Sequence, residues 1–376
     1  MNKKQLIIAL ILCVVLGTAY FFVSDSSVSD ISYGKINPFG TEGANSVRKI
    51  VIKQGDRELT LKYNQSKWCI SDLDNFSADF SKIVSFIRKL TDLKPVDTVE
   101  ITKQLYGKLG LNPAEKGAST VQVIFYTDND RLISKLLLGK FHNSRSSGVE
   151  QSAVNIPDGR YILSPGCSYP VLINDSLSDI APDPQYWSSK KWFRFKNIKS
   201  ISYQSADNKD KWTVARTDAK SKFSVSVKPS DDEVIKPNVI SNVSSAFDNF
   251  EFDEVVQKSK VKFDKPDTVT LQTFDGFKYK IKVAAQDGNY YLDIAVSADL
   301  PKKKTAEKAE KAENDKKDKK DKKSAAESEN DALKSRLEFE RHLSEWVYKV
   351  PSYKVNSFIK SSGDFLKKVD KKKDEK

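Results

Sequence analysis

The same order of strand-like and helical patterns occurs twice in this chain, about 150 residues apart. In the first occurrence, three segments alternate apolar with polar residues, as antiparallel strands with one buried face do: 47–54, 58–63 and 67–70. A helical pattern, a strand, a short helical turn, a hairpin and two closing strands follow. In the second occurrence, the corresponding opening strands are 198–204, 211–216 and 222–227. This ordered agreement predicts an α+β fold of two tandem duplicated sheet-and-helix units.

The predicted helix of each unit should pack one face on its sheet. In the first unit, five apolar residues stand at helical spacing: Phe80, Ile83, Val84, Ile87 and Leu90. Ser77 is the expected cap of this helix, and Asp231 with Asp232 are the expected caps of its counterpart in the second unit. We further expect residues 345–366 to close the second unit as 160–180 close the first.

The units are expected at 47–186 and 187–366, and the second carries a Lys/Glu-rich insert at 301–330. Between Lys302 and Lys323 there are eleven lysines and six acidic residues. Such a segment cannot bury a core, so it is expected to be disordered or a solvated helix. The basic tail at 367–376 has the same character. Residues 302–323 and the tail carry +5 and +3 of the net charge of +12.

The amino-terminal sequence is typical of a membrane anchor. Residues 1–23 comprise a short basic start and an uncharged run from Gln5 to Val23, long enough to cross a bilayer core of about 30 Å. The lysines before the run place the start in the cytoplasm. We therefore expect a single-pass signal-anchor, a spacer at 24–46, and export of the bulk of the chain to the far side of the membrane.

Two alternatives remain for the amino terminus. The small residues at 17–19 would suit a signal peptidase, although apolar residues continue beyond them. A lipid-modified Cys13 is less favoured, because the bulky Leu12 precedes it. In an exported chain Cys69 and Cys167 could form a disulfide, or each could be an isolated buried thiol.

The residues needed for most catalytic chemistries are scarce. There are two histidines: His142 lies near three serines but lacks an orienting acid in the sequence, and His342 lies in a charged amphipathic stretch. Gly139 and Lys140 resemble a fragment of a phosphate-binding loop, without its other glycine and its hydroxyl residue. Paired acids occur in turns and charge runs, where solvation explains them: Asp128 with Asp130, Asp179 with Asp183, and Asp231 with Asp232.

We therefore predict no enzyme, no catalytic, cofactor-binding or metal-binding residue, no cofactor and no small-molecule substrate. A hydrolase with a hidden carboxylate pair is the remaining catalytic alternative. Specific nucleic-acid binding is not expected either, because the basic residues gather in the insert and the tail rather than on a folded face.

One segment between the two units mixes aromatic with basic residues. The aromatic residues are Trp187, Trp192, Phe193 and Phe195, and the basic residues are Lys190, Lys191, Arg194 and Lys196. Such a mixture can stack on sugars or bases, or lie on a membrane surface. Alternatively, the aromatic rings pack the two units together and the lysines face water.

The first unit also carries features that resemble a known family. These features are Trp68, the stretch 75–100 with its helix, the segment 106–123 with Gly110, Leu111 and Pro113, and the strand 136–140 that ends in Gly-Lys. Their order is similar to that in the bacterial domain-of-unknown-function 4340 family, over roughly residues 47 to 300 and the closing strands. The second unit departs from the pattern at 261–266 and in its Lys-rich insert.

The resemblance implies a single-pass envelope protein of a bacterial inner membrane, with its bulk in the periplasm, of a kind often linked with ABC-type transport or gliding auxiliary systems. It brings no catalytic residues. Together with the anchor and the duplication, it predicts a non-enzymatic accessory or scaffold protein of the envelope that holds a protein partner. The alternative is a module that binds an envelope polymer, peptidoglycan or an anionic glycan, through residues 187–195.

Overall fold

The computed structural model describes residues 36, 38–112, 119–143, 157–300 and 316–369, with side chains from 330 onward in the last range. The described chain is α+β with large antiparallel sheets, as the sequence predicts. It divides into two compact units, which are described separately. Unit 1 comprises Met1–Tyr63 and Ser81–Pro182, and unit 2 comprises Asn64–Phe80 and Asp183–Lys376.

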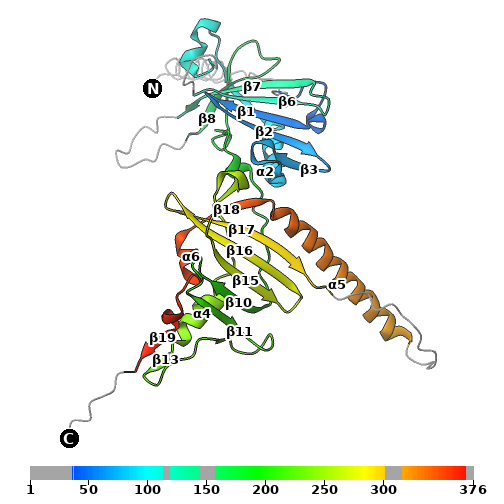
Figure 1. Cartoon of the computed structure of the whole chain (residues 1–376). Coiled ribbons are helices and arrows are strands. Elements are labelled where there is room, and N and C mark those ends of the chain that lie inside the picture. The colour runs from blue at the N-terminus through cyan, green and yellow to red at the C-terminus, as the bar shows by residue number, and fades with distance from the viewer. Residues whose placement is uncertain (1–35, 37, 113–118, 144–156, 301–315, 370–376) are drawn as a thin grey trace, which may run out of the picture. The chain divides into compact units, whose positions relative to one another are not determined.

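Unit 1 holds seven of the nine strands of the first antiparallel sheet, in the order β2-β1-β6-β7-β8-β9-β5; the other two, β3 (Lys67–Ile70) and β4 (Phe76–Ser77), fall in the segment 64–80 that is assigned to unit 2. Figure 1 shows these strands in colours that run from blue through cyan to green. Their bounds are β1 (Lys49–Gln54), β2 (Arg57–Asn64), β5 (Pro95–Thr98), β6 (Val121–Tyr126), β7 (Leu132–His142), β8 (Gly159–Leu163) and β9 (Val171–Ile173). Helix α2 (Phe80–Thr91) and the 3-10 helices η1 (Ala44–Ser46) and η3 (Lys103–Leu109) accompany the sheet.

Helix α2 buries a different face from the one expected. Ile83, Phe86 and Leu90 are buried, whereas Phe80 is 63% and Val84 44% exposed. Phe86 lies four residues before Leu90, and Ile83 lies three residues before Phe86, so the three side chains form one stripe along the helix. Val84 lies outside this stripe. The cap was also wrong, because Ser77 lies in strand β4 (Phe76–Ser77) and the helix begins three residues later.

The folded body begins earlier than Val47. Ile36 and Phe39 fall in the segment predicted to be a spacer, yet both are buried, and the Phe39 ring lies 5.0 Å from that of Phe125 in β6. The polar composition around these two residues concealed their role as core residues.

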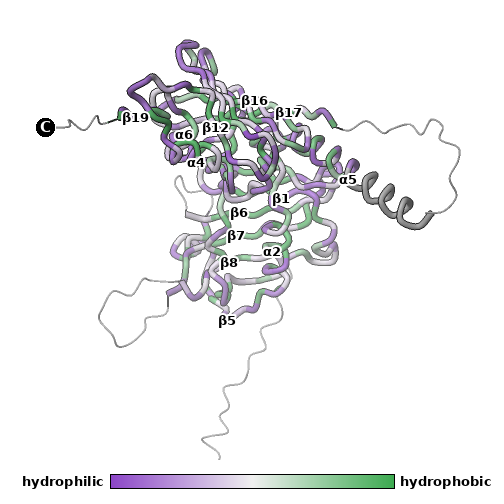
Figure 2. Tube along the Cα trace, turned by 90° about the horizontal axis from the view of Figure 1, so that it is seen from below, coloured by the Kyte–Doolittle hydropathy of each residue, from purple (hydrophilic) through white to green (hydrophobic). Residues whose placement is uncertain are grey.

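Unit 2 is built on a second antiparallel sheet, in the order β12-β11-β10-β15-β16-β17-β18-β14. Its strands are β10 (Ile198–Gln204), β11 (Lys211–Ala215), β12 (Ser224–Val225), β14 (Glu254–Gln257), β15 (Asp267–Thr273), β16 (Phe277–Gln286), β17 (Asn289–Ala298) and β18 (Trp346–Val350). Along β16 buried and exposed residues alternate, and apolar and polar colours alternate along the strands of Figure 2.

The remaining elements of unit 2 lie outside its eight-stranded sheet. They are β3 (Lys67–Ile70), β4, η2 (Ser71–Leu73), α3 (Pro184–Trp187), α4 (Pro237–Ser245), η4 (Lys258–Lys260), α5 (Lys316–Leu343), α6 (Ser352–Phe358), η5 (Ser362–Phe365), and the strand pair β13 (Glu233–Ile235) and β19 (Leu366–Lys368). The expected caps Asp231 and Asp232 were wrong. Strand β13 follows them, and α4 begins at Pro237 with Lys236 as its N-cap.

The two sheets share a strand order. Read across the sheet, β2-β1-β6-β7-β8-β9-β5 in unit 1 corresponds position by position to β11-β10-β15-β16-β17-β18-β14 in unit 2. One predicted correspondence changes. The prediction aligned 345–366, which begins with β18, with 160–180, which begins with β8. By position in the sheet, however, β18 matches β9, and β17 matches β8. The insert obscured this, because it separates the last two strands of the second sheet.

The insert lies between two strands that pair directly. Tyr290 in β17 is opposite Val350 in β18, and Asp293 is opposite Val347. Helix α5 lies within this connection, so residues 316–330 are helical, while 301–315 lie outside the described residues. Figure 1 shows α5 extending beyond the strands of unit 2.

The predicted anchor at residues 5–23 lies outside the described residues, so its structure is not described. Among the described helices, none combines the length and the apolar character needed to cross a membrane.

Candidate functional site

The aromatic segment predicted as a binding stretch belongs largely to the core of unit 2. Trp187, Phe193 and Phe195 are buried, and Trp192 is partly exposed. The Phe195 ring lies 5.0 Å from that of Tyr279 in β16, and the Trp192 ring lies 4.2 Å from that of Tyr348 in β18. The four basic residues of the segment are exposed. The rings thus pack inside unit 2 while the cationic groups face water.

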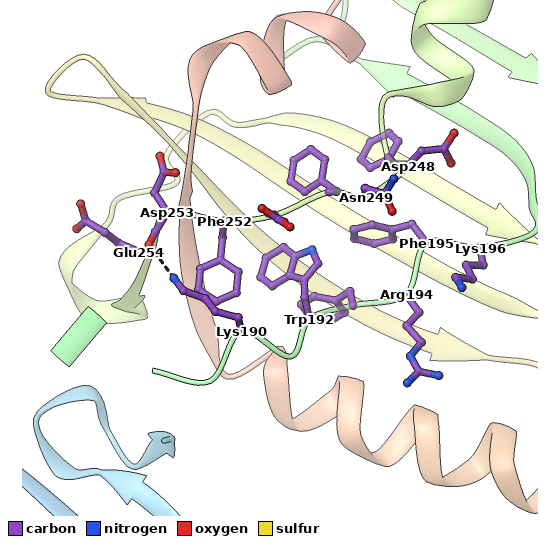
Figure 3. A pocket seen from close by; sticks show the side chains of 14 residues that line it. Lys190, Trp192, Arg194, Phe195, Lys196, Asp248, Asn249, Phe252, Asp253 and Glu254 are labelled. Atoms are coloured by element: carbon purple, nitrogen blue, oxygen red, sulfur yellow. Dashed lines mark hydrogen bonds between the residues drawn. The ribbon is translucent and has the colours of Figure 1, made fainter. Parts of the chain in front are cut away.

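A groove of about 980 Å³ runs beside this segment, and Figure 3 shows its lining side chains. One wall is 190–196, and the other is 247–254, the connection from α4 to β14. Trp192 from the first wall and Phe252 from the second lie together at the floor of the groove, with ring centroids 4.7 Å apart. The full lining is Lys190, Trp192, Phe193, Arg194, Phe195, Lys196, Phe247, Asp248, Asn249, Phe250, Glu251, Phe252, Asp253 and Glu254.

Hydrogen bonds hold both walls in place. The Lys190 ammonium donates to the Asp253 carbonyl at 3.3 Å and lies 4.7 Å from the centroid of the Phe252 ring. At the end of the second wall, the side-chain amide of Gln185 bonds both backbone groups of Val255, at 2.8 and 2.9 Å. The amide therefore satisfies the exposed edge of β14 as a neighbouring strand would.

The two walls carry opposite charges. Lys190, Arg194 and Lys196 line one wall, and four acidic residues line the other: Asp248, Glu251, Asp253 and Glu254. The Glu254 carboxylate lies 2.7 Å from the Lys349 ammonium, and this hydrogen bond raises the pKa of Lys349. The Trp192 indole N–H is buried without a hydrogen-bond partner among the described residues. Such a groove can stack an apolar or planar group on its floor and pair charges along both walls.

The first wall is also tied to helix α5. The Glu340 carboxylate is fully buried and accepts hydrogen bonds from the Arg194 backbone N–H at 3.0 Å, the Tyr279 hydroxyl at 2.7 Å and the Arg336 guanidinium at 2.9 Å. Arg336 also pairs with Asp275 at 2.7 Å. Burial, followed by the nearby Glu340 charge, raises the pKa of Tyr279. Sequence reasoning missed this network, because Glu340 looks like any other charge in a charged helix.

The two histidines have polar partners. His142 Nδ1 lies 2.9 Å from the Asp158 carboxylate, an acid that the sequence analysis did not connect with it, and the serines near His142 at 144–147 lie outside the described residues. His342 lies between Lys67, at 2.9 Å, and Glu345, at 3.2 Å. Neither histidine lines the groove.

Gly139 and Lys140 lie inside β7, so Gly139 has a structural role. A side chain at Gly139 would collide with the Leu109 carbonyl, and Gly110, which has a positive φ of +67°, lies against Lys140. The two motif segments that carry the family resemblance, 106–111 and 136–140, therefore contact each other closely.

Cys69 and Cys167 are free thiols, the first buried and the second half-buried. Burial raises the pKa of both. No group of His, Cys, Asp and Glu side chains suited to a metal ion occurs in the part of the chain that the structure describes.

A scan of the chain against models of known protein families finds no match, and searches of curated proteins and of solved structures find no similar protein either.

Proposed function

We propose that this chain is a membrane-anchored, non-enzymatic accessory or scaffold protein of the bacterial envelope that holds a protein partner in the groove of unit 2. The observation that carries the proposal is the groove itself, with its aromatic floor and its oppositely charged walls. An extended peptide segment can place an apolar side chain on such a floor and charged side chains along both walls. An ABC-type transporter is the partner that the family resemblance suggests.

The proposal includes a tandem duplication behind a signal-anchor at residues 1–23. The shared strand order of the two sheets supports the duplication, because seven strands would have to agree in order by chance otherwise. The uncharged run at 5–23 supports the anchor and thus a single-pass protein of the inner membrane with its bulk in the periplasm.

The test is chemical crosslinking of the full chain in its native membrane, followed by mild detergent extraction and identification of the captured protein. Reversing two groove charges, Arg194→Glu with Lys196→Glu, should reduce the captured partner about tenfold, a loss of ~1.4 kcal/mol in binding. Lys199→Glu is the matched control, because Lys199 is exposed on β10 next to the wall but does not line the groove. Equal capture by all three proteins, or no captured partner, would contradict the proposal.

A second candidate is a module that binds peptidoglycan or an anionic glycan, favoured by one observation. The partly exposed Trp192 has an indole N–H without a partner among the described residues, and aromatic rings stack on sugar faces. Trp187 cannot serve in this role, because it is fully buried. Retention of the chain on isolated cell wall, weakened by Trp192→Ala, would favour this candidate, and unchanged retention would exclude Trp192 as the contact.

The hydrolase alternative is the least supported. Four carboxylates line the groove, but Asp248, Glu251 and Asp253 are exposed and Glu254 is paired with Lys349.

A further inference from the structure

Unit 1 has a cavity of its own, of about 480 Å³, beside the turn between β8 and β9. Strand β7 contributes Lys135 and Leu137, and η3 contributes Lys103 and Tyr106. The end of β8 and the turn contribute the rest of the lining: Leu163, Ser164, Pro165, Gly166, Cys167 and Ser168.

The turn is a defined structure. The Cys167 N–H donates to the Ser164 carbonyl at 3.2 Å, and Gly166 has a φ of +83°. Proline followed by a glycine of positive φ is the arrangement of a type II turn. Ser164 and Cys167 are therefore held at the two ends of one tight turn beside the cavity.

The charge of this cavity distinguishes it from the groove of unit 2. Its lining contains two lysines and no carboxylate. The groove, by contrast, carries both signs, as do a cavity near Asp264 in unit 2 and one near Arg131 in unit 1. An anion entering the cavity of unit 1 would therefore meet two cations and no repelling acid.

Two further side chains in the lining suit an anion. Ser164 is only 3% exposed, and its hydroxyl has no hydrogen-bond partner among the described residues. A buried hydroxyl without a partner is unfavourable, and rotation about its one side-chain torsion can turn it towards an acceptor in the cavity. Burial raises the pKa of the Cys167 thiol, so this group stays neutral near pH 7 and adds no competing negative charge.

We propose that this cavity binds a small organic anion with a short apolar body, such as a carboxylate. The ammonium groups of Lys103 and Lys135 attract the anionic group, and the Ser164 hydroxyl donates a hydrogen bond to it. Leu137, Leu163 and Pro165 cover the apolar body. This inference concerns unit 1 alone and is independent of the function proposed for the groove.

The half-buried Cys167 thiol provides the readout. Full-length protein in detergent is treated with iodoacetamide, and the alkylation of each cysteine is followed by peptide mass spectrometry in the presence of hexanoate, hexanamide or hexylammonium. Hexanoate should slow the alkylation of Cys167 in a saturable way, and the amide and the ammonium should not. Cys69 is 2% exposed and should resist alkylation in the folded chain, so its modification would report unfolding and serves as the control for the fold.

Matched variants identify the groups that bind. Lys103→Met with Lys135→Met should raise the hexanoate concentration needed for half-protection about tenfold, equivalent to ~1.4 kcal/mol. Lys108→Met with Lys140→Met changes exposed lysines on the same two elements outside the cavity and should leave it unchanged. Ser164→Ala should weaken protection without lowering the melting temperature, because the hydroxyl has no protein partner to lose.

Three results would overturn the proposal: absence of protection by hexanoate, equal protection by all three probes, or an equal effect of the two lysine pairs. A melting curve for each variant checks that it is folded. If Ser164→Ala leaves hexanoate protection intact, the assigned role of the hydroxyl is overturned.

Discussion

Arg160 in β8 is a buried cation whose hydrogen bonds go to backbone carbonyls. It is 3% exposed and donates to the carbonyls of Gly139 and Leu177, each at 2.9 Å, while its guanidinium lies 4.6 Å from the centroid of the Phe141 ring. Burial lowers its pKa to about 10, still high enough for a charged side chain at neutral pH. Arg160 thus ties the segment after β9 to the neighbouring strand β7.

Arg160→Met should lower the free energy of unfolding of unit 1 by about 2–4 kcal/mol, because two charge-assisted hydrogen bonds are lost and their carbonyls stay buried. Hydrogen exchange of the backbone amides of β7 and β8 at increasing urea concentration, followed by mass spectrometry, gives the measurement. Arg131→Met is the control, since Arg131 is an exposed residue paired with Glu42, and its loss should cost much less stability than the loss of Arg160. Equal losses in the two variants would contradict the role assigned to Arg160.

Asp207 lies in the loop between β10 and β11 and should titrate unusually low. The Ser205 hydroxyl first, then the Lys209 N–H and ammonium, lower its pKa to about 2 from an ordinary 3.8. Because the folded value is the lower one, the carboxylate stabilises the fold above pH ~4, and this contribution fades as the pH falls towards 2. NMR titration of the carboxyl carbon should show a midpoint near 2.

The hydroxyl can be tested separately. In Ser205→Ala the midpoint of Asp207 should rise towards its ordinary value, since the largest cause of the shift is gone. A wild-type midpoint near 3.8 would show that these hydrogen bonds do not form in solution.

Helix α5 packs on unit 2 through its carboxy-terminal half. Leu337, Glu340 and Leu343 are buried, and the Arg336 guanidinium lies 4.0 Å from the centroid of the Phe277 ring. The segment before residue 330 is rich in lysine and acidic residues. The second half of α5 is therefore part of unit 2.

Deleting Lys302–Ser324 should leave the melting temperature of unit 2 within a few degrees, the shift expected for ~1 kcal/mol. The strands β17 and β18 pair directly, and loop closure costs only about 0.6 kcal/mol per doubling of length. Glu340→Ala provides the contrast within the same helix. It removes a buried acid from Arg336 and should cost about 3–5 kcal/mol. A large loss on deletion would show that the basic half of α5 stabilises the fold.

Unit 2 is assembled from two segments that are far apart in the sequence, 64–80 and 183–376. The Trp346 indole N–H donates to the Leu73 carbonyl at 2.7 Å, and Phe76 packs on the Trp346 ring at 5.1 Å. Residues 64–80 thereby belong to unit 2, although the sequence repeat assigns them to the first copy. The compact units and the sequence repeats consequently have different boundaries.

Trypsin should cut the intact chain first among the lysines of 302–323, and the two fragments should stay together. The carboxy-terminal fragment would carry β18 and β19, and β18 pairs with both β17 and β14 of the other fragment. Size-exclusion chromatography of the nicked protein should give a single peak that contains both. A separate soluble carboxy-terminal fragment would mean that β18 is not a strand of this sheet, and would contradict the proposed duplication.

The sequence alone was enough to predict the α+β class and most strands, because alternation of apolar residues directly reports a sheet with one buried face. It also indicated where the insert lies. It could not assign the buried face of α2, where Phe80 and Phe86 are equally apolar and only the neighbouring core distinguishes them. Local patterns contain no information about which residue a distant segment will cover.

The candidate sites depended still more on tertiary structure. The aromatic segment was visible in the sequence, but only the fold buries Trp187 and leaves Trp192 in a groove, opposite an acidic wall some 55 residues further along the chain. The Glu340 network and the cavity beside Cys167 had no sequence signal, since their members come from separate elements. Periodicity along the chain determines strands and helices, whereas the meeting of opposite charges, the burial of one carboxylate and the shape of a cavity are decided when those elements pack.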